Sequence, residues 1–93
     1  MALSVLIVDD EELIRYGLRE WLQEEGYTVM EAEDGTTALE TANEEPNIIL
    51  LDYKLPDMDG LTVLKELSSR PGNPVIIMMT GYGTIELAVE AMR

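Results

Sequence analysis

Cysteine and histidine are both absent from this 93-residue chain, and their absence excludes several kinds of chemistry. Without cysteine there can be no disulfide framework, no thiolate nucleophile and no zinc–thiolate site. Without histidine there is no imidazole base, no imidazole metal ligand and no histidine that could carry a phosphoryl group. The reactive groups that remain are carboxylates, hydroxyls and two lysines. This set suits hard, oxygen-preferring cations such as Mg²⁺.

Basic residues and long hydrophobic runs are also scarce. Six lysines and arginines stand against 19 acidic residues, so the formal net charge is −13. A surface of this sign repels nucleic acids and anionic membranes, and direct nucleic-acid binding is not expected. No stretch approaches the ~20 apolar residues of a membrane span, and the apolar opening at 2–8 lacks a basic leader. We expect a globular cytoplasmic protein.

Four short apolar runs, each followed by a segment with helical spacing, organise the chain. The runs are predicted to be strands and cover residues 3–8, 27–31, 48–51 and 75–79. Parallel strands need crossover connections, so the alternation predicts an α/β fold, a doubly wound parallel sheet with helices on both faces. The chain stops within its fourth helical segment without a stop signal, and we expect it to be part of a larger domain.

The first helical segment has apolar residues that recur with a period of about 3.6. The apolar set, expected to face the core, is Leu13, Ile14, Gly17, Leu18, Trp21 and Leu22. Gly26 stands where a helix C′ residue belongs. Charged residues on this helix, including Arg15, Arg19 and Glu20, could contact a partner protein, but we interpret them as a solvated face. The second and third helical segments are expected to end before Pro46 and Pro71.

Polar side chains follow three of the predicted strands. Asp9 and Asp10 follow the first, Asp52 the third and Thr80 the fourth. Ligands of open parallel sheets bind at the carboxyl ends of the strands, so the three carboxylates converge if the first and third strands are neighbours. They would then raise one another's pKa, a conflict that a bound Mg²⁺ relieves.

Each of these residues also has a purely structural explanation. Asp9 or Asp10 could cap the first helix, with Glu12 completing a capping box. Asp52 could form a turn, and Thr80 could open a helix. The joint placement at three strand ends favours the functional interpretation.

Three stretches of the sequence resemble the signature stretches of response-regulator receiver domains. They are LIVDDE at 6–11, IILLDYKLPDMDG at 48–60 and VIIMMTG at 75–81. The spacing between them matches too, and residues 80–92 are similar to receivers of nitrogen-regulation-type transcription activators. The resemblance implies a flavodoxin-like fold with strand order 2-1-3-4-5, the order known for receiver proteins. It also implies that residues 1–93 hold four of five strand–helix units, without the fifth strand and fifth helix.

The resemblance implies a role for each matching residue. Asp52 corresponds to the aspartate that takes a phosphoryl group from the phosphohistidine of a partner sensor histidine kinase. Asp10 corresponds to a direct Mg²⁺ ligand and Asp9 to its acidic neighbour, which acts through water. Asp52 and the backbone carbonyl of Lys54 complete the metal ligands. The absence of histidine fits this role, because the donor histidine belongs to another protein.

Residues near the end of the chain also have counterparts in the family. Thr80 corresponds to the switch hydroxyl and Gly81 to the residue whose backbone amide lines the site. In the family, a lysine at the end of the fifth strand and an aromatic switch residue within it complete the site. Residues 1–93 do not include that strand, so we expect function to be impaired, with weak or short-lived phosphorylation. The apolar run 75–79 would then form an exposed edge, and we expect a homodimer or other self-association through this strand and the fourth helix.

Two alternatives to a phospho-accepting, non-enzymatic signalling domain remain open. The stretch DMDG at 57–60 resembles the nucleophile motif of haloacid-dehalogenase-type phosphatases, in which Asp57 would be the nucleophile. In those phosphatases the first aspartate of the motif directly ends a strand. In this sequence Asp52 ends the predicted strand, and Pro56 precedes the motif. The other alternative is a pseudo-receiver, an interaction module that is not phosphorylated.

Overall fold

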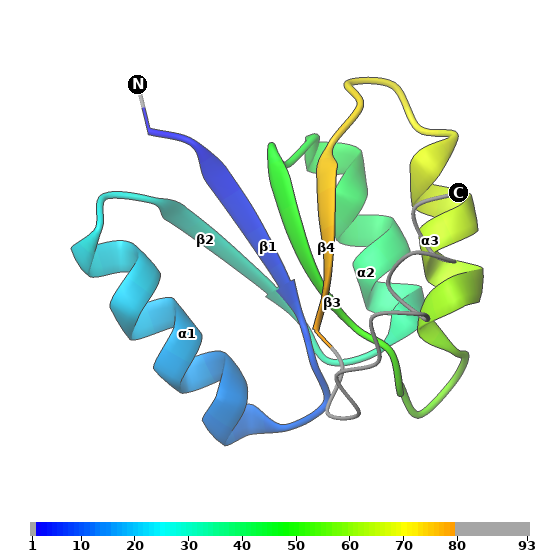
Figure 1. Cartoon of the computed structure of the whole chain (residues 1–93), viewed down its shortest axis with the longest axis horizontal. Coiled ribbons are helices and arrows are strands. Elements are labelled where there is room, and N and C mark those ends of the chain that lie inside the picture. The colour runs from blue at the N-terminus through cyan, green and yellow to red at the C-terminus, as the bar shows by residue number, and fades with distance from the viewer. Residues whose placement is uncertain (1, 80–93) are drawn as a thin grey trace.

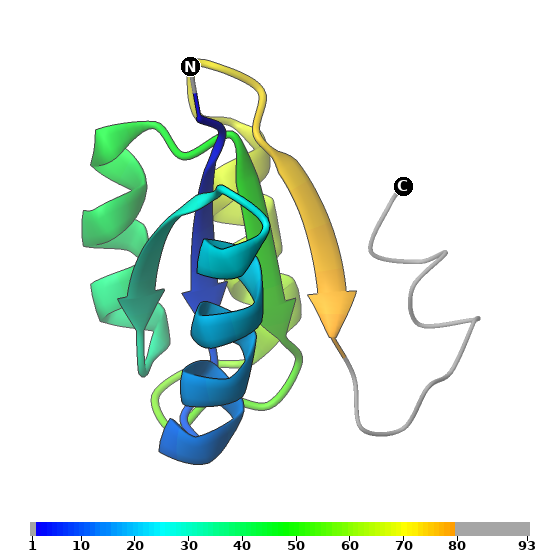
Figure 2. The same cartoon turned by 90° about the vertical axis from the view of Figure 1, so that its left-hand side faces the viewer.

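A computed structural model describes residues 2–79, whose strands and helices alternate along the chain (Figures 1 and 2). The elements are β1 (Ser4–Val8), α1 (Glu12–Glu24), β2 (Thr28–Ala32), α2 (Gly35–Thr41), the short 3-10 helix η1 (Ala42–Glu44), β3 (Ile48–Asp52), α3 (Gly60–Ser68) and β4 (Val75–Met79). The predicted strands agree with the observed ones to within one residue at each end. The predicted fourth helix, with Thr80 and Gly81, lies outside the described residues.

The strands form one parallel sheet in the order β2-β1-β3-β4. In β1, Val8 pairs with Ala32 of β2 on one side and with Leu51 of β3 on the other. Both neighbours of β1 therefore end at the same edge of the sheet as β1 itself. The predicted doubly wound α/β fold is confirmed, and so is the proximity of the first and third strands.

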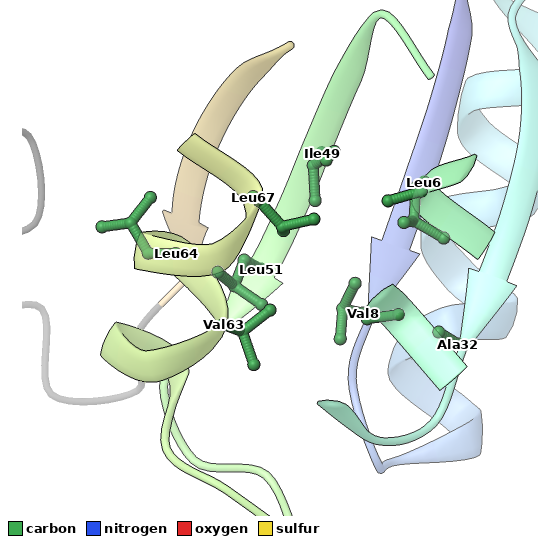
Figure 3. Packing of buried hydrophobic residues seen from close by; sticks show 10 residues of the cluster. Leu6, Val8, Ala32, Ile49, Leu51, Val63, Leu64 and Leu67 are labelled. Atoms are coloured by element: carbon green, nitrogen blue, oxygen red, sulfur yellow. The ribbon is translucent and has the colours of Figure 1, made fainter. Parts of the chain in front are cut away.

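Helices cover both faces of the sheet, with α1 on one face and α2 and α3 on the other (Figures 1 and 2). Side chains of a strand alternate between the faces, so β1 contributes to two separate cores. The core beneath α2 and α3 is the larger one (Figure 3), and its main residues are Leu6, Val8, Ala38, Ile49, Leu51, Val63, Leu64 and Leu67. The core beneath α1 is centred on Val5, Ile7 and Leu22. Burial of β1 on both faces explains its continuous apolar run.

The apolar face predicted for α1 is only partly buried, which corrects that expectation. Leu22 is buried and Leu18 packs against the smaller core, but Leu13 is 84% exposed and Trp21 is 60% exposed. The contacts of α1 are mainly with β1 and β2, so only the side chains that point at these two strands are buried. Among the described residues no second helix lies on this face of the sheet, so the flank of α1 has no helix to pack against.

Local signals fix most of the helix ends. Gly26 has a φ of 95°, which suits the left-handed C′ position predicted for it. The side chain of Asp34 caps α2 by accepting from the Thr37 amide at 2.7 Å, and that of Asp59 caps α3. The second helical segment changes to a 3-10 turn before it ends, and Glu45 then takes a positive φ of 53°.

Candidate functional site

Three carboxylates converge at the carboxyl edge of β1 and β3. One carboxylate oxygen from each of Asp9, Asp10 and Asp52 lies within 4.8 Å of the others. The arrangement follows from the sheet order, because β1 and β3 are hydrogen-bonded neighbours. The convergence predicted from the strand ends is confirmed.

Asp9 is the only buried charged residue among those described, with 6% exposure. Its amide donates to the Ala32 carbonyl at 3.1 Å, which extends the β1–β2 ladder by one residue. A carboxylate oxygen of Asp9 accepts from the Glu11 amide at 2.9 Å. This contact spans two residues and forms a local turn before α1. The helix begins after Glu11 without a side-chain cap, so the capping box of Asp9 with Glu12 is wrong.

The pKa of Asp52 is raised by its place in the cluster. Partial burial raises the pKa of Asp52 above 3.8, and the charges of Asp9 and Asp10 raise it further, against the opposing effect of the backbone amides of Lys54 and Tyr53. Both ion pairs between residues 2 and 79 join α1 to β2, so neither neutralises the three carboxylates. A cation would stabilise all three ionised groups, and this all-oxygen donor set fits Mg²⁺.

The chain after Asp52 makes a tight return that only glycine permits at its end. The Gly60 amide donates to the Tyr53 carbonyl at 2.6 Å, and Lys54 forms an antiparallel bridge with Asp59. A Cβ on Gly60 would lie 2.7 Å from the Asp52 carbonyl oxygen and 2.7 Å from the Tyr53 Cα. Close backbone packing therefore fixes the position of Lys54 relative to the end of β3.

Asp57 faces α2 and stands apart from the three clustered carboxylates. Its Oδ1 accepts from the Gly35 amide at 2.8 Å. Its Oδ2 accepts from the Thr36 amide at 2.9 Å and from the Thr36 hydroxyl at 2.7 Å. These hydrogen bonds lower the pKa of Asp57 to about 2. Both oxygens are engaged in holding the loop to α2, which argues against Asp57 as a nucleophile.

From the sequence, Arg15 is interpreted as a solvated surface residue, and the structure shows that this is wrong. Its side chain is only 13% exposed, and its Nε pairs with Glu31 Oε1 at 3.2 Å. Arg15 Nη1 also donates to the Asp9 carbonyl at 2.6 Å. Arg19 pairs with the other Glu31 oxygen at 2.8 Å. The available signal was Glu31 itself, because a charged residue in a strand of a two-sided sheet needs a partner.

None of the helices between residues 2 and 79 combines the length and the apolar character needed to cross a membrane.

Comparison with known proteins gives consistent matches. The family model of the response regulator receiver domain matches residues 5–93. Sporulation initiation phosphotransferase F of Bacillus subtilis is 40% identical over 89 residues, which cover 95% of this chain and 72% of that protein. The regulatory protein AtoC of Escherichia coli is also 40% identical, over 96% of this chain, but the chain spans only 20% of AtoC.

Solved structures agree with the sequence matches. The receiver domain of a putative Luxo repressor protein from Vibrio parahaemolyticus superposes with a TM-score of 0.90 and 29% identity, covering 99% of this chain and 72% of that one. NtrX from Brucella abortus superposes with a TM-score of 0.89 and 36% identity, covering 100% of this chain and 21% of that one. Regulators of the NtrX type are thus among the matches, as the sequence resemblance led us to expect.

Proposed function

Since this chain belongs to the response regulator receiver domain family, we propose that it accepts a phosphoryl group on Asp52 with Mg²⁺ bound beside it. Receiver domains of two-component systems take phosphoryl groups from sensor histidine kinases and are generally signalling domains rather than enzymes. The observation that carries the proposal is the convergence of Asp9, Asp10 and Asp52 within 4.8 Å. The partner of this chain is therefore a sensor histidine kinase.

The metal site consists of oxygen donors only. Asp10 and Asp52 would bind the Mg²⁺, Asp9 would contribute its negative charge from a buried position, and the backbone carbonyl of Lys54 would complete the protein ligands. When bound, Mg²⁺ offsets the negative charge of the transferring phosphoryl oxygens. The raised pKa of Asp52 supports this assignment, because burial first and the charges of Asp9 and Asp10 second disfavour its ionised form, and a divalent cation would offset both effects.

Asp52 is the nucleophile in the proposed reaction. One of its carboxylate oxygens forms a bond to phosphorus while the bond from phosphorus to the donor imidazole nitrogen breaks. The electron pair of that bond stays on the imidazole, which is protonated on its other nitrogen and leaves as neutral histidine. The products are an acyl phosphate on Asp52 and a dephosphorylated partner. Thr80 and Gly81 keep their predicted roles as the switch hydroxyl and the lining amide.

Phosphoryl labelling tests this function directly. The intact mass is measured after incubation with acetyl phosphate and Mg²⁺ for the wild type, Asp52→Asn and the matched variant Asp57→Asn. We expect one added phosphoryl group on a fraction of the wild type and of Asp57→Asn, because phosphorylation is expected to be weak or short-lived, and none on Asp52→Asn. Loss of labelling in Asp57→Asn alone would instead support the phosphatase alternative. A wild type that neither gains mass nor binds beryllofluoride with Mg²⁺ would be a pseudo-receiver.

We further propose that two copies of this chain associate through β4. This strand is at the edge of the sheet over residues 2–79, and its residues Val75 and Ile77 are 59% and 49% exposed. Apolar edge strands offer unpaired backbone groups to a second chain. Light scattering over a concentration series should show a dimer that Ile77→Lys weakens. A monomer mass at every concentration would contradict this proposal.

A further inference from the structure

Arg15 joins three elements around the turn that carries Asp9 and Asp10. Arg15 lies on α1, its Nε contacts Glu31 of β2, and its Nη1 donates to the backbone carbonyl of Asp9 just after β1. We infer that Arg15 is a positioning residue for the metal site, holding the main chain of this turn so that the carboxylates stay convergent. The inference rests on the proposed Mg²⁺ site.

The geometry at Asp9 shows why this turn depends on an anchor. The Asp9 amide is the last donor of the β1–β2 ladder, so the chain leaves the sheet at this residue. The Asp9 side chain is held from one side by the Glu11 amide at 2.9 Å. Its carbonyl is held from the other side by Arg15 at 2.6 Å. Together these contacts fix the orientation of Asp9 and the start of Asp10, on which the spacing of the ligand oxygens depends.

The contact from Arg15 is suited to this role because its guanidinium is largely removed from solvent. The side chain of Arg15 is 13% exposed, and that of its partner Glu31 is 29% exposed. A charge-assisted hydrogen bond is stronger than a neutral one, and a planar guanidinium can serve two acceptors in a fixed relative orientation. Glu31 therefore sets the orientation of Arg15, and Arg15 sets the position of the Asp9 carbonyl.

Arg19 provides a matched control on the same helix. It carries the same charge and pairs with the same Glu31, at 2.8 Å, but it has no hydrogen bond to Asp9. Its guanidinium lies over the Tyr16 ring, 5.2 Å from the centroid. Removing Arg19 therefore reproduces the loss of charge and the loss of a Glu31 partner without releasing the turn.

Charge and positioning predict opposite effects on Mg²⁺ affinity. A positive side chain near the three carboxylates repels Mg²⁺, so electrostatics alone predicts tighter binding when either arginine is replaced by a neutral residue. Loss of positioning predicts weaker binding for Arg15 only. The sign of the change consequently distinguishes the two explanations.

The test measures Mg²⁺ binding to the full chain by amide NMR shifts for the wild type, Arg15→Met and Arg19→Met, with thermal unfolding of each. We expect the Mg²⁺ dissociation constant of Arg15→Met to rise roughly 10–100-fold, the range for loss of an outer-shell partner. Arg19→Met should bind Mg²⁺ as tightly as the wild type or more tightly. An Arg15→Met chain that binds as tightly as Arg19→Met overturns the inference.

Arg15→Lys keeps the test valid if Arg15→Met does not fold. Lysine preserves the charge, so electrostatics predicts no change in Mg²⁺ affinity. A single ammonium cannot reproduce the two-acceptor fork, so positioning predicts several-fold weaker binding. Wild-type affinity in Arg15→Lys would overturn the inference. Failure of the wild type itself to bind Mg²⁺ would instead refute the proposed function.

Discussion

Replacing Gly60 by alanine would place a methyl carbon where the chain after β3 already passes. The new Cβ would lie 2.7 Å from both the Asp52 carbonyl oxygen and the Tyr53 Cα, and 2.9 Å from the Tyr53 carbonyl oxygen. Ordinary contacts between such atoms are about 3.5–4.0 Å, so one backbone segment must move by about 1 Å. Backbone atoms cannot rotate away as a side chain can. The return of the loop onto β3 must therefore open.

The expected loss of stability follows from two opposing effects. Overpacking of this kind costs about 1–3 kcal/mol. Alanine recovers only part of the about 0.5–1 kcal/mol that it gains over glycine in the middle of a helix, because Gly60 is the first residue of α3. We expect a net loss of about 1–2 kcal/mol, which lowers the Tm by about 4–8 °C per kcal/mol in a domain of this size. Mg²⁺ binding should also weaken, because Lys54 lies in the same loop.

Urea unfolding followed by circular dichroism measures this change, and Gly17→Ala is its control. Gly17 lies within α1, and apart from the backbone of the helix itself no atom lies within 4 Å of an added Cβ. Its replacement by alanine should therefore stabilise the protein by about 0.5–1 kcal/mol. The same substitution should thus lower the stability at Gly60 and raise it at Gly17. A Gly60→Ala protein as stable as the wild type would refute the steric argument.

Three further changes test the charges and the core. Asp52→Asn should raise the Tm at pH 7 in a chelating buffer. The pKa of Asp52 is raised above 3.8, so the wild type loses stability as pH rises from 3.8 through the raised pKa, whereas asparagine stays uncharged. An equal Tm for both proteins at pH 7 would contradict this. Asp57→Asn should lower the urea midpoint at pH 7, and the difference should shrink from pH 4 to pH 2, because the stabilisation from a pKa of about 2 is lost as pH falls through it. A difference independent of pH would assign the effect to packing. Leu67→Ala, at a fully buried position, should cost about 2–5 kcal/mol in urea unfolding, whereas Leu13→Ala, at an 84% exposed position, should change stability by less than about 0.5 kcal/mol. Equal losses would contradict the burial of the two leucines.

The sequence determined the order and kind of the elements and three residues of the site. The apolar runs identify the strands because both faces of β1 are covered and one face of β3 is buried while the other is half-buried, and few polar residues can occupy such strands. The crossover requirement then makes the strands parallel and brings their carboxyl ends to one edge. Asp9, Asp10 and Asp52 could be found in this way because each lies at or just after a strand end.

Only the tertiary structure decided which side chains pair with one another around that site. Arg15 reaches Glu31 across 16 residues of sequence, and Asp57 reaches Gly35 across 22. No periodic pattern encodes such pairs, because each depends on how a helix or a loop is placed against the sheet. The same holds for Leu13, which fits the apolar period of α1 and is nevertheless exposed. A local pattern specifies which face of a helix is apolar, but whether that face is buried depends on what the rest of the chain places against it.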